Sequence, residues 1–204
     1  MSSILKVDEI QDTSGNNIIN ENANTVTIGK SGDTVNVVGT LQNGGTNFLQ
    51  GITMADQWRL TADVTTTDSV LTTNLERVDT AGQGTLGTGM TESSGVFTFP
   101  STGIYLVEFD TTYFLSGDSR YVSARIEATV DNSTYNPVAL DTSFVQQTQS
   151  GATSGFVRTS SLIDVTDVSN VKVKFRVSSF ASVTFGSNTT YNRTFMTFIR
   201  LGDT

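Results

Sequence analysis

The chain has 204 residues, a net charge of −8, and neither cysteine nor histidine. The charge argues against binding of nucleic acid or anionic lipid through a basic surface, and the two missing residue types exclude disulfides, thiolate zinc sites, Cys nucleophiles and His-based catalytic triads. Hydrophobic residues make up only 36% of the chain, against roughly 45–50% in average globular domains. We therefore expect a partner subunit to supply part of the burial, and we expect no cofactor.

Residues 1–20 form a short amphipathic lead. The segment has no basic region followed by a long apolar run, so it does not resemble a signal peptide, and no stretch approaches the ~20 apolar residues of a membrane span. We expect synthesis in the cytoplasm and no membrane partner. The candidates for attachment to a larger particle are the apolar side chains of the lead: Ile4, Leu5, Val7 and Ile10.

Residues 24–41 carry a repeated strand pattern. Val26 and Ile28 alternate with threonines, a Gly-containing turn follows, and Val35 and Val37 alternate again. Each predicted strand is about four residues long, too short for one chain to close a core. Three copies around an axis, as in a small triangular β-prism, could bury these four side chains; an exposed hairpin is the alternative.

The predicted domain boundary lies near residue 50. Asn43-Gly44-Gly45 is the clearest break in the sequence. We therefore assign residues 1–50 to an attachment arm and short β stem, 51–56 to a linker, and 57–204 to a head.

Short strands separated by Gly, Asn, Ser and Asp turns follow to the end of the chain. Period-two alternation is clearest in Ile104–Phe114, Val122–Val130, Val171–Val177 and Phe195–Leu201. This pattern is typical of an antiparallel sandwich or jelly roll. The last strand is apolar on both faces, as in a central strand or one at a subunit interface. We predict core or trimer-interface positions for four aromatic residues: Tyr105, Tyr113, Phe195 and Phe198.

Residues 95–107 contain Gly-x-Phe-Thr-x-Pro followed by Gly-x-Tyr. This segment resembles the opening motif of C1q/TNF-like jelly rolls, and Phe195–Asp203 is similar to the final strand of that family. In residues 165–170 the usual Leu-x-x-Gly-Asp turn is missing. The resemblance covers about residues 57–204, and it implies a homotrimeric jelly-roll head in which Pro100 and Gly103 form a turn and Tyr105 packs inward.

A second resemblance lies outside that motif. Residues 4–16 resemble the start of structural proteins from tailed phages of aquatic bacteria, including cyanophages, and similar segments lie at Trp58–Leu60, Asn74–Arg77 and Leu86–Met90. It implies a virion-surface protein without enzymatic activity. We expect a homotrimeric capsid decoration, or cement, protein that contacts the major capsid protein or another virion protein. The alternative is a tail or head fibre whose jelly-roll head binds a host surface glycan or protein.

Three other motifs are weaker. Residues 82–87 match G-x-G-x-x-G, but without the strand and helix that a dinucleotide site needs. Four carboxylates are candidates for a glycosidase acid/base pair: Glu108, Asp110, Glu127 and Asp131. The first three lie on predicted polar strand faces, where solvated charge is the ordinary interpretation. Asp164 and Asp167 could bind calcium in a loop, although turn formation is the simpler role.

Four strand aromatics could line a sugar-binding groove or pack in the core. We favour the core, because aromatic residues on strands are usually buried. They are Tyr105, Phe109, Tyr113 and Phe114.

Overall fold

The computed structural model describes residues 9–11, 13–14, 17–22, 25–28, 31–39, 42–43, 46–47 and 51–204. The chain divides into two compact units, Met1–Gln50 and Gly51–Thr204. Every regular element of the described residues is a β-strand, which confirms the all-β prediction. In this part of the chain there is no helix long and apolar enough to cross a membrane.

The N-terminal unit contains a small antiparallel sheet of three strands, β1 (Glu9–Gln11), β2 (Asn17–Asn22) and β3 (Thr25–Ile28). A second pair joins β4 (Gln42–Asn43) to β5 (Thr46–Asn47). The strand predicted around Val35 and Val37 is wrong for the single chain, because residues 33–37 are described and form no strand. Within the described part of this unit, Val35 and Val37 belong to none of the paired strands.

The head contains the other eleven strands. Six are short: β6 (Ala55–Leu60), β7 (Val64–Val70), β8 (Leu75–Arg77), β9 (Thr91–Ser93), β10 (Val96–Thr98) and β16 (Phe195–Gly202). Five have ten or more residues: β11 (Gly103–Leu115), β12 (Ser119–Thr129), β13 (Asn136–Val145), β14 (Thr153–Val165) and β15 (Lys172–Phe185).

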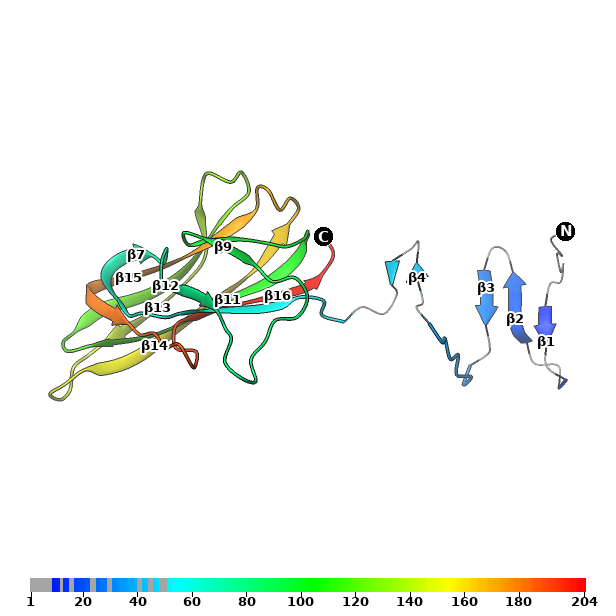
Figure 1. Ribbon diagram of the computed structural model, residues 1–204, viewed down its shortest axis with the longest axis horizontal. Coiled ribbons are helices and arrows are strands. Elements are labelled where there is room, and N and C mark those ends of the chain that lie inside the picture. Colours follow the sequence, from blue (N-terminus) through cyan, green and yellow to red (C-terminus); the bar gives the residue numbers. More distant parts are fainter. Residues whose placement is uncertain are drawn as a thin grey trace. The chain divides into compact units, whose positions relative to one another are not determined.

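These strands form a curled antiparallel sheet that folds into two layers (Figure 1). One layer has the order β13-β12-β15, with β7 and β10 also paired to β15; we call it the outer layer. The other has the order β14-β11-β16-β6-β8; we call it the inner layer. β15 links the two, because its end pairs with β11 at Tyr113↔Phe185. The alternation seen in the sequence therefore gives each layer one face toward the core.

Aromatic side chains fill the space between the layers. Phe175 of β15 lies 5.3 Å from Phe97, 5.0 Å from Phe109 and 5.8 Å from Phe198, measured between ring centroids. All four rings are 0% exposed. Such pairs add about 0.5–1.5 kcal/mol each beyond their buried area, so this cluster is the energetic centre of the head.

The Gly-x-Phe-Thr-x-Pro motif folds as the sequence predicts. Ser94 and Gly95 both have positive φ and close the two-residue turn between β9 and β10. A Cβ on Gly95 would lie 2.3 Å from the carbonyl oxygen of Leu71, so only glycine fits. Pro100 belongs to the turn that leads to β11, where the hydroxyl of Tyr105 donates to the backbone oxygen of Ser101 at 3.0 Å and the ring is buried.

The segment predicted as a linker is largely part of the head. Met54 is 3% exposed in the core, and β6 already begins at Ala55. Asp56 is 1% exposed, and its carboxylate accepts hydrogen bonds from the backbone of Met90 and from Nε of Arg77. Met54 and Asp56 are therefore packed in the head only a few residues after the boundary at residue 50, so residues 54–56 do not act as a flexible linker.

Candidate functional site

Strand β16 lies centrally between β11 and β6, and its two faces differ. Met196 and Phe198 are 0% exposed and point into the core. Phe195 and Ile199, on the other face, are half-buried, and Leu201 is 52% exposed. Burial on both faces, as the sequence suggested, is therefore not reached within a single chain, and the second apolar face is open.

That open face extends over the inner layer. Strand register places Leu106 of β11 beside Leu162 of β14 and Ile199 of β16, forming an apolar row across three strands. Leu162 is 63% exposed. The next rows add polar groups, including an Asp110–Arg158 ion pair of 2.5 Å. We call the solvent-facing side of β14, β11 and β16 the outward face. These three strands belong to the inner layer, so the outward face is not part of the outer layer.

A second apolar surface lies where β13 and β14 run side by side at the edge of the sandwich. Phe144 is 65% exposed and Phe156 is 77% exposed, and both line a groove of about 450 Å³. Tyr113 closes its floor, with its hydroxyl donating to Oγ of Ser143 at 2.8 Å. Leu140, 51% exposed, belongs to the same edge strand. We call this surface the β13–β14 edge.

The predicted core-or-interface residues divide between these environments. Tyr105, Tyr113 and Phe198 are buried in the core, and Phe195 lies on the outward face. Of the four aromatics weighed for a sugar groove, Tyr105, Tyr113 and Phe109 are buried and Phe114 is half-buried.

The stem residues lie open in the single chain. The exposed fractions are 60% for Val26, 55% for Ile28, 52% for Val35 and 48% for Val37. Ile10 lies in β1 and is 39% exposed, while Ile4, Leu5 and Val7 lie outside the described residues. These five apolar side chains are therefore left at least partly uncovered within the single chain.

Of the four weighed carboxylates only Glu108 and Asp110 lie near each other, two positions apart on β11, and Asp110 is held in an ion pair with Arg158. Glu108 and Asp110 lie on the outward face of the inner layer, and Glu127 lies on the opposite, solvent-facing side of the outer layer. The expectation of a solvated Glu127 is wrong: the residue is 7% exposed, and Nε of Arg176 donates to it at 2.8 Å. Asp131 lies in the turn after β12, where the backbone N–H of Thr134 is the main cause of its lowered pKa. No acid/base pair of the glycosidase type results.

Asp164 and Asp167 do not form a cation site. Asp164 is an exposed residue of β14, and Asp167 accepts from the backbone N–H of Ser169 at 2.7 Å and from Nδ2 of Asn170 at 2.7 Å. Among the described residues no group of three His, Cys, Asp or Glu side chains could hold a metal ion. The turn role of Asp167 is thus the one the geometry supports.

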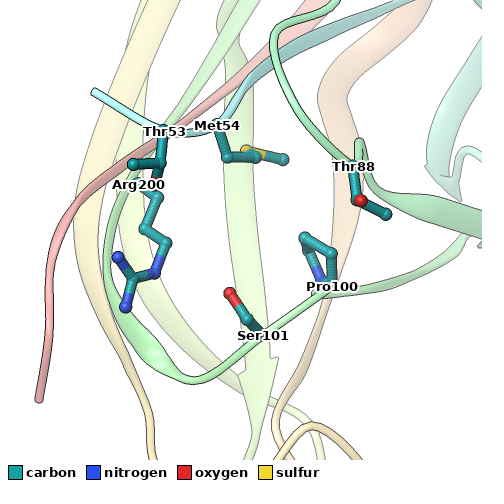
Figure 2. Close-up of a pocket in the computed structure, with 6 residues that line it drawn as sticks. All are labelled: Thr53, Met54, Thr88, Pro100, Ser101 and Arg200. Carbon is teal, nitrogen blue, oxygen red and sulfur yellow. The ribbon is translucent and has the colours of Figure 1, made fainter. Parts of the chain in front are cut away.

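A small hollow of about 280 Å³ lies near the turn of the Pro100 motif. Figure 2 shows Arg200 and Ser101 on one side and Pro100 and Thr88 on the other. Nε of Arg200 already donates to the carbonyl of Thr102 at 3.0 Å, and its guanidinium also pairs with Asp203. The six lining residues include no carboxylate, so this hollow offers no general acid or base.

No protein-family model and no curated protein matches the sequence. Among solved structures, an Eiger TNF from S. frugiperda is similar over 76% of this chain and 96% of its own length, at 14% identity and a TM-score of 0.53. A murine APRIL structure is similar over 72% of this chain and 98% of its own, at 11% identity and a TM-score of 0.49.

The first of these likenesses, together with the antiparallel two-layer arrangement, defines the head as a C1q/TNF-like jelly roll. That confirms the fold expected from the Gly-x-Phe-Thr-x-Pro motif. At this level of identity the likeness is one of fold alone, and the fold is compatible with a structural or binding role.

Proposed function

We propose that the chain is a non-enzymatic structural protein that assembles as a homotrimer on the surface of a phage particle. The observation that carries the assembly is the pair of unlike apolar surfaces on one head. The outward face presents Leu106, Leu162 and Ile199, and the β13–β14 edge presents Leu140 and Phe144 of β13. Phe156 lies on the same side of β14 as Leu162, where the two surfaces meet. Apolar patches of this kind mark interaction sites.

Two different surfaces on one molecule fit a head-to-tail contact. In such a contact the edge of one copy packs on the outward face of the next, and the assembly is finite only when the rotation closes into a ring. Three copies close that ring in the proposal. The stem gives independent support for three, since its short strands and half-exposed Val26, Ile28, Val35 and Val37 need partners around an axis.

The particle role rests on sequence resemblance and on the size of the stem. Residues 4–16 and three head segments resemble virion proteins of tailed phages. About 50 residues folded back and forth at ~3.3 Å per residue make only a short rod. We therefore favour capsid decoration, with the major capsid protein or another virion protein as partner, over a long-reaching fibre. The proposed location is the virion surface, after synthesis in the host cytoplasm.

We expect Leu162→Glu to convert the trimer to a monomer. The side chain is 63% exposed in the single chain, so the fold tolerates the change, but a carboxylate buried at the contact costs several kcal/mol. Light scattering after gel filtration should give the 21.9 kDa mass of one chain in place of three times that mass. Val130→Glu, at a residue 78% exposed beyond β12, is the matched control and should remain trimeric. A wild-type protein that runs as a monomer, or a trimer unchanged by Leu162→Glu, contradicts the proposed interface.

Deleting residues 1–50 should leave a folded head that no longer joins the particle. The head has its own core, while the proposed attachment residues lie in the deleted arm. Cryo-electron microscopy of particles carrying tagged full-length protein checks the location, and incorporation of tagged 51–204 checks the role of the arm. Label over the icosahedral shell supports decoration, and label confined to the tail favours the fibre. Normal incorporation of the truncated head would contradict the proposal that residues 1–50 attach the protein to the particle.

A further inference from the structure

The solvent-facing side of the outer layer concentrates positive charge on an acidic chain. β12 and β15 pair in a register that sets Arg125 opposite Arg176 and Glu127 opposite Lys174. Lys172 follows at the next outward position of β15. Four of the chain's 12 basic residues thus share one sheet face. We call it the basic face.

The charges on this face are only partly compensated. Glu127 accepts from Arg176 at 2.8 Å and contacts Arg125 at 3.6 Å, and Asp68 of β7 pairs with Arg176 at 3.1 Å. These four cations and two carboxylates leave a net charge of +2, which falls to +1 when the ionised Asp131 of the nearby turn is included. Like charges directly opposite on neighbouring strands are destabilising, so placing Arg125 opposite Arg176 costs stability that Glu127 partly offsets.

The two lysines keep their charges available. Neither Lys172 nor Lys174 takes part in an ion pair among the described residues. Nζ of Lys174 lies 3.8 Å from the ring centroid of Tyr135, which orients the ammonium group without neutralising it. Asp131, in the nearby turn, stays ionised and accepts hydrogen bonds from the N–H groups of Ser133 and Thr134, but it forms no ion pair with either lysine. These ammonium groups can therefore meet an anionic ligand.

Exposed aromatic rings continue the basic face at its other end. Tyr121 is 40% exposed and Phe180 is 56% exposed, with their ring centroids 6.4 Å apart. The guanidinium of Arg120 lies 4.8 Å from the ring centroid of Phe180. From Lys172 to Phe180 the strand rises by eight residue steps, or about 26 Å at ~3.3 Å per residue. The face is long enough for several units of a polymer.

We infer that the basic face binds an anionic polysaccharide. Sugar rings have apolar C–H faces that pack on Tyr121 and Phe180, and their carboxylate or sulfate groups pair with Lys172, Lys174 and Arg125. A duplex nucleic acid fits less well, because its stacked bases offer no ring face to Tyr121 and Phe180. Charge complementarity and exposed rings together select the acidic glycan.

This inference goes beyond the proposed particle role and does not depend on it. The basic face lies on the outer layer, whereas the outward face belongs to the inner layer. The β13–β14 edge, which the proposed trimer contact also uses, adjoins the basic face, because Leu140 of β13 pairs with Arg125 of β12. Lys172, Lys174 and Phe180 lie on β15 and Leu162 lies on β14, so substitutions at these residues test glycan binding and trimer formation separately.

Calorimetric titration of the full-length protein tests the inference. The probes are alginate oligosaccharides for carboxylates, dextran sulfate for sulfates, neutral dextran, and a short DNA duplex. We expect binding to at least one acidic glycan, none to neutral dextran, and a fall in affinity with added salt. Lys172→Glu/Lys174→Glu should weaken binding about tenfold or more, and Phe180→Ala should weaken it by roughly threefold to tenfold. The anionic probe that binds identifies carboxylate or sulfate as the recognised group.

Lys6→Glu/Lys30→Glu is the matched control, since it changes the net charge equally but lies in residues 1–50. It should bind as the wild type does. Lys172→Gln/Lys174→Gln serves if the Glu variant fails to fold, and light scattering on the same samples reports assembly separately. The inference is overturned if neither acidic glycan binds, or if the control weakens binding as much. It is equally overturned if DNA binds as well as the glycans and Phe180→Ala has no effect, which indicates simple polyanion adsorption.

Discussion

Replacing Arg59 by alanine should lower the free energy of unfolding of the head by about 3 kcal/mol, the lower end of the range for breaking a buried ion pair. The guanidinium is 0% exposed and donates to Glu76 and Asp79, each at 2.7 Å. It also donates to Oγ1 of Thr80 at 3.0 Å and to the carbonyl of Thr189. The lower end applies because Glu76 is 34% exposed and Asp79 is 77% exposed, so water can solvate both carboxylates once the cation is lost.

The position of Arg59 gives this variant a distinctive signature. The side chain joins β6 to two loops that are more than a hundred residues apart in sequence, around Asp79 and Thr189. Urea unfolding measures the stability loss, and hydrogen exchange should accelerate in residues 76–83 and 187–192 before the rest of the head. Arg59→Lys keeps the charge but loses the planar fork, so its loss should be intermediate. Arg120→Ala, at an exposed residue, should change stability by less than about 0.5 kcal/mol. Equal losses of stability for Arg59→Ala and Arg120→Ala would contradict the proposal that Arg59 holds β6 to these two loops.

The strands of the head were predictable because their alternation is local. Val173, Phe175 and Val177 of β15 face the core, as their spacing requires, and the turn before Tyr105 follows from Pro100 and the glycine three residues later. Such patterns depend on neighbours one or two positions away. The sheet type and the inward ring of Tyr105 could therefore be predicted from one sequence.

The ion pairs could not be predicted, because their partners are distant in sequence. Arg59 follows Trp58 in a strand, where alternation alone places it on a solvated face, and nothing local indicates the loops that cover it. Glu127 looks equally solvated until strand pairing brings Arg176 beside it. A sequence signal does exist for the first case: a lone arginine between Trp58 and Leu60, with acidic residues 17 and 20 positions later at Glu76 and Asp79.

The stem shows a different limit. Val35 and Val37 alternate as a strand should, yet in the single chain this segment forms none. Alternation predicts which side chains seek burial, but a strand also needs a hydrogen-bonding partner. In the proposed trimer another copy supplies that partner, and the sequence of one chain cannot specify where it lies.

Phe175→Ala should destabilise the head by about 3–5 kcal/mol, the range for removing a fully buried phenylalanine. Its ring contacts Phe97, Phe109 and Phe198, so the substitution removes contacts with both layers at once. The strands that carry these rings are held in place by backbone hydrogen bonds to their neighbours within each layer. They cannot move together freely to fill the cavity, so we expect the loss of stability to lie in the upper half of that range. Against a typical stability of roughly 5–15 kcal/mol, a monomeric head would be close to unfolding.

Phe180→Ala on the same strand is the matched control, because it removes the same atoms from a ring that is 56% exposed. Its effect on the unfolding free energy should stay within about 0.5 kcal/mol. Chemical denaturation followed by the fluorescence of Trp58, whose ring lies 5.5 Å from that of Phe97, reports directly on the core. The measurement belongs in the monomeric Leu162→Glu background, since subunit association stabilises the folded state by mass action and would hide part of the loss. Similar losses for Phe175→Ala and Phe180→Ala in that background would mean that the two layers are not held together by the aromatic cluster.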